Sequence, residues 1–174
     1  KLVQHTTDRI MLSAVGKGAE EVQQLLSSKA TLTVFSRSLA LPITLNYQTP
    51  ETLGLDRIAA AVGAMTLYPE RNILVIDAGS CITVDLIEKG RVFCGGTISP
   101  GVQMRFKAMH TFTDRLPLVT ASSAEVKNTA MPGRSTDECM KAGVLKGIQW
   151  ELEGNIHHYS SLHPDLIVIM TGGD

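Results

Sequence analysis

The pattern of apolar and polar positions predicts a mixed α/β chain. RIMLSAVGKG (9–18) has the pattern of a short strand that ends at a glycine turn, and EEVQQLL (20–26) has apolar residues at helical spacing. TLTVF (31–35) and LPITLNY (41–47) have the β-branched content of strands. The first third of the chain is therefore expected to form strand, helix, strand and strand.

A helix is predicted within TPETLGLDRIAAAVGAMTLYP (49–69). Thr49 is expected to cap a helical turn and Pro50 suits the first position of that turn, while Pro69 bounds the helix at its other end. The inward stripe of this helix is expected to consist of Ile58, Ala61, Val62 and Met65.

The centre of the chain predicts a buried strand followed by a β-meander. NILVID (72–77) contains a continuous apolar run from Ile73 to Ile76, as in strands that are covered on both faces. CITVDLI (81–87) alternates between apolar and polar residues, as in a strand, and EKG has the composition of a turn. RVFCGGTI (91–98) is then expected to form the next antiparallel strand. SPGVQMRFKAMHTFTDRLP (99–117) then predicts a turn that leads into a helix.

The last third predicts a loop, a long helix and a final strand. VTASSAEVKNTAMPG (119–133) is polar and rich in helix breakers, which favours a surface loop. Ser135 and Glu138 have the spacing of a capping box. HPDLIVIMTGGD (163–174) predicts a buried strand that ends in two glycines. The helix between them is expected to bury Leu145, Ile148, Leu152 and Ile156 on one face.

Composition narrows the classes of protein. Of 174 residues, 44% are hydrophobic and 19% charged, which is typical of globular proteins. The net charge of -1 offers no overall attraction for nucleic acid or for acidic membranes, and no apolar run approaches the roughly 18 residues of a membrane span. Three cysteines without a CxxC pair argue against a disulfide framework and favour the cytoplasm. Because the chain opens without Met and stops after a strand-like run, we expect part of a longer protein.

The stretch DAGS, which joins two predicted strands, is the first candidate for chemistry. Gly79 permits a tight turn whose N–H groups can face an anion, and Asp77 can hold a cation that offsets phosphate charge. Ser80 and Thr83 add hydroxyl groups. A plain hairpin with a solvated aspartate explains the same residues, and so does the D-[ST]-G loop of aspartic proteases, although Ala78 replaces its hydroxyl residue.

Two further stretches leave a functional and a structural interpretation open. GLDR (54–57) places an acid and a base before an apolar helix. Asp56 is either a helix-capping residue or a general base. Arg57 either forms a local ion pair with Asp56 or binds an anionic group of a substrate. TGGD (171–174) is either a simple turn at a strand end or a place where Gly172 and Gly173 let a flat ring approach.

The order of these motifs resembles the type III pantothenate kinase family. The resemblance is carried by YQTPETLGLDRIAAAVGA, LVIDAGSCITVDLI, FCGGTISPGVQMRFKAMHTFTDRLP, GRSTDECMKAGVLKGI and TGGD, and it covers the chain from about Tyr47 to its end. It implies an α/β fold of two ribonuclease-H-like lobes with mixed sheets flanked by helices, as in actin and the sugar kinases. We expect residues 1–69 to be the remainder of the N-terminal lobe and residues 70–174 to be the C-terminal lobe.

The resemblance also implies an activity. Members of this family phosphorylate the hydroxyl of pantothenate with ATP to give 4'-phosphopantothenate, the first step of coenzyme A synthesis. They use Mg²⁺ and a monovalent cation such as K⁺ or NH₄⁺, and they are typically homodimers whose interface helps to form the substrate pocket.

By the same resemblance, Asp56 is the proton acceptor and Asp77 binds the monovalent cation. Ser80, which stands where the family usually has threonine, contacts ATP phosphate together with the Gly79 turn. Gly172 and Gly173 lie near the nucleotide. The substrate contacts are expected from Tyr47, Gly54, Leu55, Asp56, Arg57 and Thr136.

One motif of the family is absent. Members begin with a strand that carries D-x-G-N-T, the first phosphate-binding loop, and HTTDRIML (5–12) does not match it. We expect that strand to belong to a segment that precedes this sequence, so the first lobe is incomplete here. Two other functions stay open: a regulatory or accessory protein on the same fold, and another kinase that acts on a sugar or on acetate.

Overall fold

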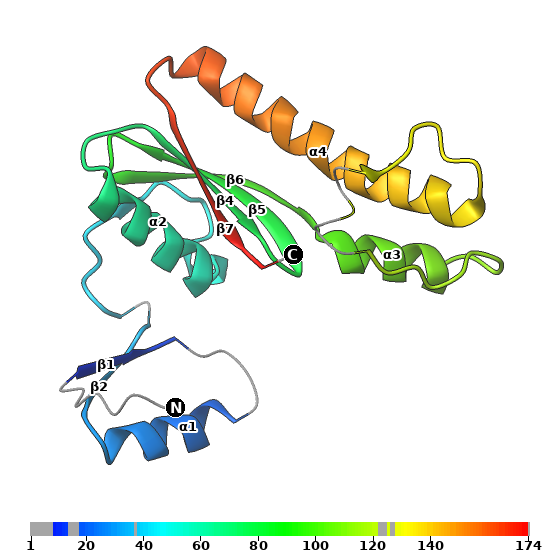
Figure 1. Ribbon diagram of the computed structural model, residues 1–174. Helices are drawn as coiled ribbons and strands as arrows, with labels where there is room; N and C mark the ends of the chain where they lie inside the picture. The colour runs from blue at the N-terminus through cyan, green and yellow to red at the C-terminus, as the bar shows by residue number, and fades with distance from the viewer. Residues whose placement is uncertain (1–8, 14–17, 37, 122–124, 126–127, 174) are drawn as a thin grey trace.

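The computed structural model describes residues 9–13, 18–36, 38–121, 125 and 128–173. It begins with a small parallel pair of strands, β1 (Arg9–Leu12) and β2 (Thr31–Val34), which helix α1 (Ala19–Ser27) connects. Figure 1 shows this unit beside the main body of the molecule. The predictions for the first two strands and their helix are confirmed.

The main body is built on a five-stranded mixed sheet. β4, β5 and β6 form the predicted antiparallel meander, β7 lies parallel to β4, and β3 lies parallel to β6. The strand order is β3-β6-β5-β4-β7. The strand bounds are Thr44–Leu45 for β3, Ile73–Ala78 for β4, Cys81–Glu88 for β5, Val92–Pro100 for β6 and Ile167–Gly172 for β7.

Helices cover both faces of this sheet. One face carries α2 (Leu55–Leu67), which follows the short 3-10 turn η1 (Pro50–Thr52), and the other carries α3 (Val102–Thr111) and α4 (Thr136–Leu162). Figure 1 shows α2 and α4 on opposite sides of the strands. The prediction of a mixed α/β fold with sheets flanked by helices is confirmed.

The alternation of residues along β4 explains this three-layer packing. Ile73 and Val75 belong to the apolar cluster under α2, whereas Leu74 and Ile76 belong to the cluster under α3 and α4. Successive side chains of a strand point to opposite faces, so a strand between two helical layers has to be apolar throughout. The four residues are at most 4% exposed, which confirms the buried strand.

The division of the chain at residues 69 and 70 stays a prediction. β3 pairs with β6, and α2 packs on β4 and β5, so the segment from Thr44 onward lies on the sheet that the later strands build. Ile58 and Ala61 of the predicted inward stripe are buried there, and Val62 and Met65 are half-buried against the same cluster.

Three local predictions are wrong. LPITLNY forms only the two-residue strand β3, because its pairing with β6 covers Thr44 and Leu45 alone. Thr49 makes no side-chain cap to the backbone of η1; its carbonyl oxygen accepts the N–H of Thr52 instead. The last strand is not buried, because β7 is an edge strand of the sheet, and Met170 is 59% exposed.

The capping box before the long helix is confirmed, with one difference. The Ser135 hydroxyl accepts the N–H of Glu138 at 3.2 Å, and the Glu138 carboxylate accepts the N–H of Arg134, one residue before the cap, at 2.6 Å. Leu145 and Ile148 are buried beneath α4, while Leu152 and Ile156 pack against the same cluster. The loop predicted over 119–133 lies partly outside the described residues.

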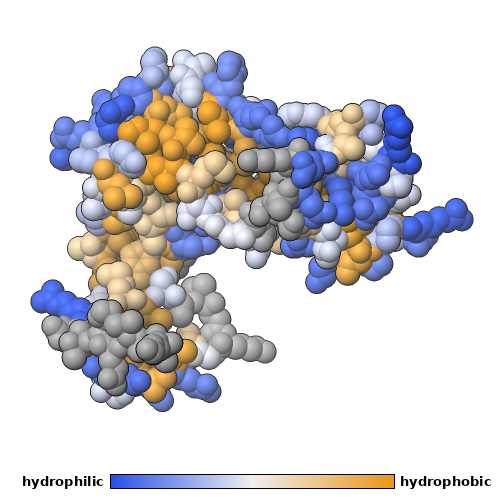
Figure 2. Space-filling view, in the orientation of Figure 1, coloured by the Kyte–Doolittle hydropathy of each residue, from blue (hydrophilic) through white to orange (hydrophobic). Residues whose placement is uncertain are grey.

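Figure 2 shows an apolar region and a largely polar region on this face of the molecule. Apolar side chains gather around the edge strand β7, where Val168 and Met170 are exposed, whereas the arm formed by α3 and the start of α4 is largely polar. Within the described parts of the chain, no helix is both long and apolar enough to cross a membrane.

Candidate active site

The pairing of β4 with β7 brings two of the candidate motifs together. Asp77 lies opposite Thr171 and Ala78 opposite Gly172, and the N–H of Gly173 donates to the carbonyl oxygen of Ala78 at 3.2 Å. Because the two strands are parallel, DAGS and TGG lie at the same end of the sheet, the carboxyl end at which open α/β sheets bind ligands.

Gly172 has a structural reason to be glycine. Its φ is 113°, and a Cβ atom there would lie 2.2 Å from the carbonyl oxygen of Ala78. A side chain would therefore strain the backbone and force β7 away from β4. Gly173, in contrast, has open space around the position of a Cβ atom. Their contact with a nucleotide stays a prediction.

The DAGS turn is held against the start of α3. The N–H of Gly79 donates to the carbonyl oxygen of Cys81 at 3.1 Å. Gly101 precedes α3, and its N–H donates to the carbonyl oxygen of Ser80 at 3.0 Å. Ser80 is exposed and Asp77 is half-buried opposite Thr83. The turn thus has a fixed backbone and an accessible Ser80 hydroxyl, while the N–H of Gly79, which was expected to face an anion, is engaged by Cys81.

Asp77 and Asp56 lie on the same side of the sheet. Cross-strand partners share a face, and so do alternate residues of one strand. Asp77 therefore shares the face of Val75, which lies in the cluster under α2. Asp56 is the second residue of α2 itself. The structure thus places both carboxylates on the α2 side.

The carboxylate of Asp56 folds back over the start of α2. It is exposed, and its Oδ1 accepts the N–H of Arg57 at 2.9 Å. A Cβ atom on Gly54 would lie 2.3 Å from that same oxygen. Glycine at position 54 therefore leaves the space that this carboxylate occupies, and the positive end of the helix dipole favours its charge.

Replacing Gly54 with alanine is expected to reduce turnover by roughly 10–100-fold, because the new methyl group displaces the Asp56 carboxylate. Gly54 has φ −58° and ψ 136°, which alanine also adopts, so the fold is expected to survive. Steady-state kinetics of the full-length protein measures the effect. Gly63→Ala in the same helix is the control: a Cβ atom there meets nothing within 4 Å. Wild-type turnover in Gly54→Ala would contradict the assignment.

Arg57 is the most constrained of the candidate residues. It is 7% exposed, and its Nε donates to Oδ2 of Asp85 at 3.0 Å while its Nη2 donates to Oδ1. The hydrogen bonds and charge of Asp85 raise the pKa of Arg57 far above its usual range. The guanidinium also lies 5.8 Å from the ring centroid of Tyr47 and 5.6 Å from that of Phe93.

Sequence reasoning missed Asp85. The available signal was a single carboxylate inside the apolar run CITVDLI, at a position whose neighbours Val84 and Leu86 are both buried. Asp85 is itself only 3% exposed, and charged residues are almost never buried unless they are paired. Its partner, Arg57, lies 28 positions away and could not be identified without the fold.

The paired glycines of β6 serve the packing around Tyr47 and Asp85. Gly95 has φ 84°, and a Cβ atom there would lie 3.3 Å from the Tyr47 ring. Gly96 lies opposite Asp85 in the sheet, and a Cβ atom there would be 1.8 Å from the carbonyl oxygen of Val84. Glycine at position 95 thus lets the Tyr47 ring lie against β6, and glycine at position 96 lets the backbone of β5 lie close to β6.

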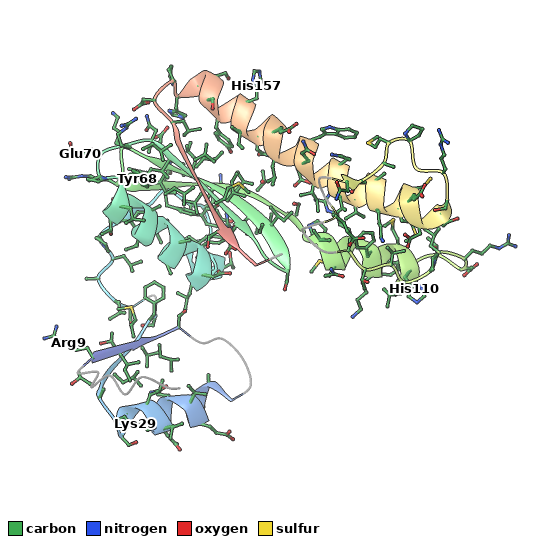
Figure 3. The ribbon with its side chains drawn as sticks, in the orientation of Figure 1. Arg9, Lys29, Tyr68, Glu70, His110 and His157 are labelled. Carbon is green, nitrogen blue, oxygen red and sulfur yellow. The ribbon has the colours of Figure 1, made fainter. Side chains whose placement is uncertain are left out.

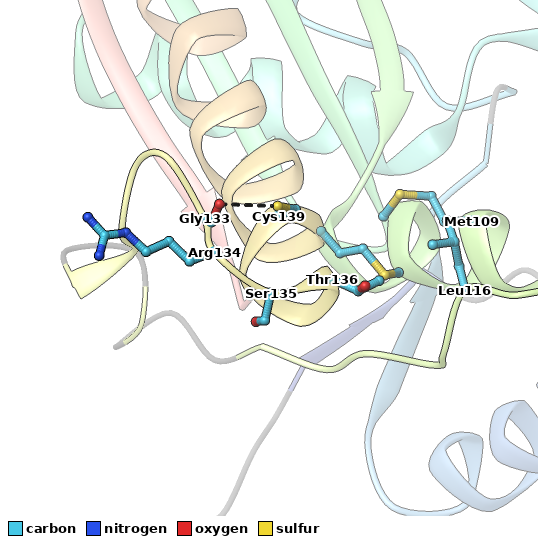
Figure 4. Close-up of a pocket in the computed structure, with 8 residues that line it drawn as sticks. Met109, Leu116, Gly133, Arg134, Ser135, Thr136 and Cys139 are labelled. Atoms are coloured by element: carbon cyan, nitrogen blue, oxygen red, sulfur yellow. Dashed lines mark hydrogen bonds between the residues drawn. The ribbon is translucent and has the colours of Figure 1, made fainter.

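Thr136 is not brought to the other candidate residues within one chain. It is the first residue of α4, which packs on the face of the sheet opposite α2. It lines a cavity of about 640 Å³ (Figure 4). The other lining residues are Met109, Leu116, Gly133, Arg134, Ser135, Cys139 and Met140.

Among the residues that the structure describes, the histidines of α3 and α4 form no cluster with the candidate residues. His110 on α3 and His157 on α4 are widely separated in Figure 3. His110 Nδ1 lies 2.8 Å from the carbonyl oxygen of Leu116. Over the described residues there is no group of three or more His, Cys, Asp or Glu side chains that would hold a metal ion.

These features define the class of protein. Three antiparallel strands, a fourth parallel strand beside the first, helices on both faces and an acid at the strand end are those of an actin-like kinase fold. The sequence pattern of the type III pantothenate kinases matches residues 1–158, and the chain belongs to that family.

Curated relatives named type III pantothenate kinase support the assignment. The protein of Christiangramia forsetii is 43% identical over 94% of this chain and 66% of its own length. That of Phocaeicola vulgatus is 46% identical over 80% of the chain and 56% of its own length. The chain thus spans between about half and two thirds of such relatives. A solved structure from Campylobacter jejuni, described as a Baf family transcriptional activator, has a TM-score of 0.61, 25% identity, and covers 98% of this chain and 70% of that one.

Proposed function

We propose that the protein transfers the γ-phosphoryl group of ATP to the hydroxyl of pantothenate, giving 4'-phosphopantothenate for coenzyme A synthesis in the cytoplasm. Relatives that carry this name support the reaction. The structural observation on which it depends is the β4–β7 register, which sets DAGS beside TGG at one end of the sheet. Asp77 lies on the face of the sheet that α2 covers, and Asp56 belongs to the first turn of α2.

The acceptor half of the site is assigned to the start of α2. A primary alcohol is a poor nucleophile at neutral pH, and a carboxylate within hydrogen-bond reach can accept its proton as the new bond to phosphorus forms. Asp56 has this role in the proposal. Tyr47, Gly54, Leu55 and Arg57 surround the substrate, with the Nη1 side of Arg57 suited to a carboxylate because Asp85 engages only Nε and Nη2.

The nucleotide half of the site is assigned to the strand ends. The hydroxyl of Ser80 and the turn at Gly79 meet phosphate oxygens, and Gly172 and Gly173 border the base or ribose. The half-buried carboxylate of Asp77 fits a K⁺ or NH₄⁺ ion beside the phosphates. Mg²⁺ is commonly held by few carboxylates together with phosphate oxygens, so it needs no cage of side chains. The bound cations would offset the charge of the phosphoryl group in transfer.

A homodimer explains the position of Thr136. Within one chain this threonine lies on the α3–α4 side of the sheet, away from Asp56. We therefore assign it to the pantothenate site of a second copy, where the α4 terminus of one chain completes the pocket of the other. Size-exclusion chromatography with light scattering checks the dimer.

A coupled ADP-release assay on the full-length protein tests the function. ADP is expected to form with pantothenate and MgATP, faster with K⁺ or NH₄⁺ than with Na⁺. Glucose and acetate serve as alternative acceptors, and turnover with either of them but not with pantothenate would replace the proposed substrate. ADP release with no acceptor preference would contradict the proposal.

A regulatory role is the second candidate. The description of the Campylobacter jejuni structure as a transcriptional activator is the observation that favours it. A full-length protein that binds neither ATP nor pantothenate in calorimetry would support this role over the kinase.

A further inference from the structure

A carboxylate in the middle of the central sheet calls for an explanation. Asp85 lies on β5 between β4 and β6, opposite Val75 and Gly96, and it is 3% exposed. Moving such a charge out of water is costly, and a buried ion pair is weak evidence for stability, because apolar side chains of similar volume often serve as well. A role in positioning explains the residue better than a role in stability.

Asp85 holds the side chain of a residue in the first turn of α2. It engages Nε and Nη2 of Arg57 together, a two-point contact that fixes the plane of the guanidinium as well as its position. The rings of Tyr47 and Phe93 flank the same guanidinium at 5.8 and 5.6 Å. Arg57 is therefore clamped between the sheet and two aromatic side chains.

The main chain of the same arginine holds the carboxylate of Asp56. The N–H of Arg57 donates to Oδ1 of Asp56 at 2.9 Å. One residue thus joins the buried acid on β5, through its side chain, to the exposed acid at the helix start, through its amide. Arg57 is thus the covalent link between Asp85 and the oxygen that its amide supports.

We infer that Asp85 is a positioning residue, which sets the first turn of α2 against β5 so that the Asp56 carboxylate is aimed at the acceptor hydroxyl. This inference rests on the proposed kinase function. Positioning errors near 1 Å can cost about 10²-fold in rate, so the role belongs to turnover rather than to nucleotide affinity.

Two variants test the inference by kinetics. Asp85→Asn keeps the shape of the side chain but removes its charge, and Asp85→Glu keeps the charge but shifts the guanidinium by one methylene. We expect kcat to fall by about 10–100-fold in Asp85→Asn and by less in Asp85→Glu, with KM for ATP within about twofold of wild type. Glu151→Gln, which removes the charge of the half-buried partner of Arg105 on the opposite face of the sheet, is the control and is expected to keep kcat. Thermal unfolding is measured for each variant to establish that it folds. If Asp85→Asn does not fold, the kinetics of Asp85→Glu test the inference.

A second readout does not depend on activity. The amide proton of Arg57 is expected to exchange slowly with solvent, because Oδ1 of Asp56 accepts its hydrogen bond, and Asp56→Ala removes that protection. Asp85→Glu is expected to speed the exchange of this amide by about twofold or more, because the hydrogen bond is lengthened. Wild-type kcat together with wild-type exchange of the Arg57 amide in folded Asp85→Glu would overturn the inference. Inactivity of the wild type towards pantothenate would overturn the proposed function instead, and the exchange of the Arg57 amide would still test the role of Asp85.

Discussion

Asp56→Asn is expected to lower kcat by about 10²–10⁴-fold, while KM for pantothenate stays within about twofold of wild type. Asparagine keeps the shape of the side chain, and its carbonyl oxygen can still accept the N–H of Arg57, as Oδ1 of Asp56 does now at 2.9 Å. What is lost is the capacity to accept the proton of the acceptor hydroxyl. Steady-state ADP release by the full-length protein measures both constants.

A matched control separates this effect from a general loss of charge. Asp114→Asn makes the same chemical change at an exposed position after α3, on the other side of the sheet from α2. It is expected to keep kcat and KM. If Asp56→Asn turns over at the rate of Asp114→Asn, then Asp56 does not accept the proton and another group has to be sought.

Most regular elements of the main body were predictable because each shows a clear pattern of apolar residues. NILVID is apolar on both faces, and the structure has a helical layer on each side of β4. Two of the three wrong predictions concern the edge strands β3 and β7. β7 has the same apolar composition as β4, but its place at the end of the strand order leaves Met170 exposed. Strand order depends on contacts distant in sequence, which a local pattern does not contain.

From the residue pattern, the candidate site was predictable only as separate motifs, and the resemblance alone placed both DAGS and TGG near the nucleotide. The pattern linked neither DAGS to TGG nor Asp85 to Arg57, because a strand register and a pairing over 28 positions make those contacts. The interpretation of Arg57 changes most. Its two-point bond to a buried acid replaces the local pairing with Asp56 that the tetrapeptide GLDR suggested.

Arg57→Met is expected to reduce the free energy of unfolding by about 3–5 kcal/mol, the typical cost of removing one partner from a buried ion pair. Asp85 would remain in the sheet interior, 3% exposed and without its arginine. Urea unfolding followed by circular dichroism measures the change. The control is Arg71→Met, whose carboxylate partner Asp165 is exposed at the surface, and a much smaller change is expected there.

The double variant Arg57→Met, Asp85→Leu decides how that loss is interpreted. If the cost arises from an uncompensated buried charge, removal of both partners restores most of the stability or exceeds it, because apolar side chains of similar volume fill the space without a desolvation penalty. The same variant is expected to remain inactive, since Arg57 and the positioning of Asp56 are both lost. A double variant as unstable as Arg57→Met would mean that the pair contributes packing that methionine and leucine cannot replace. Stability recovered without activity would separate the role of the pair in catalysis from its role in folding.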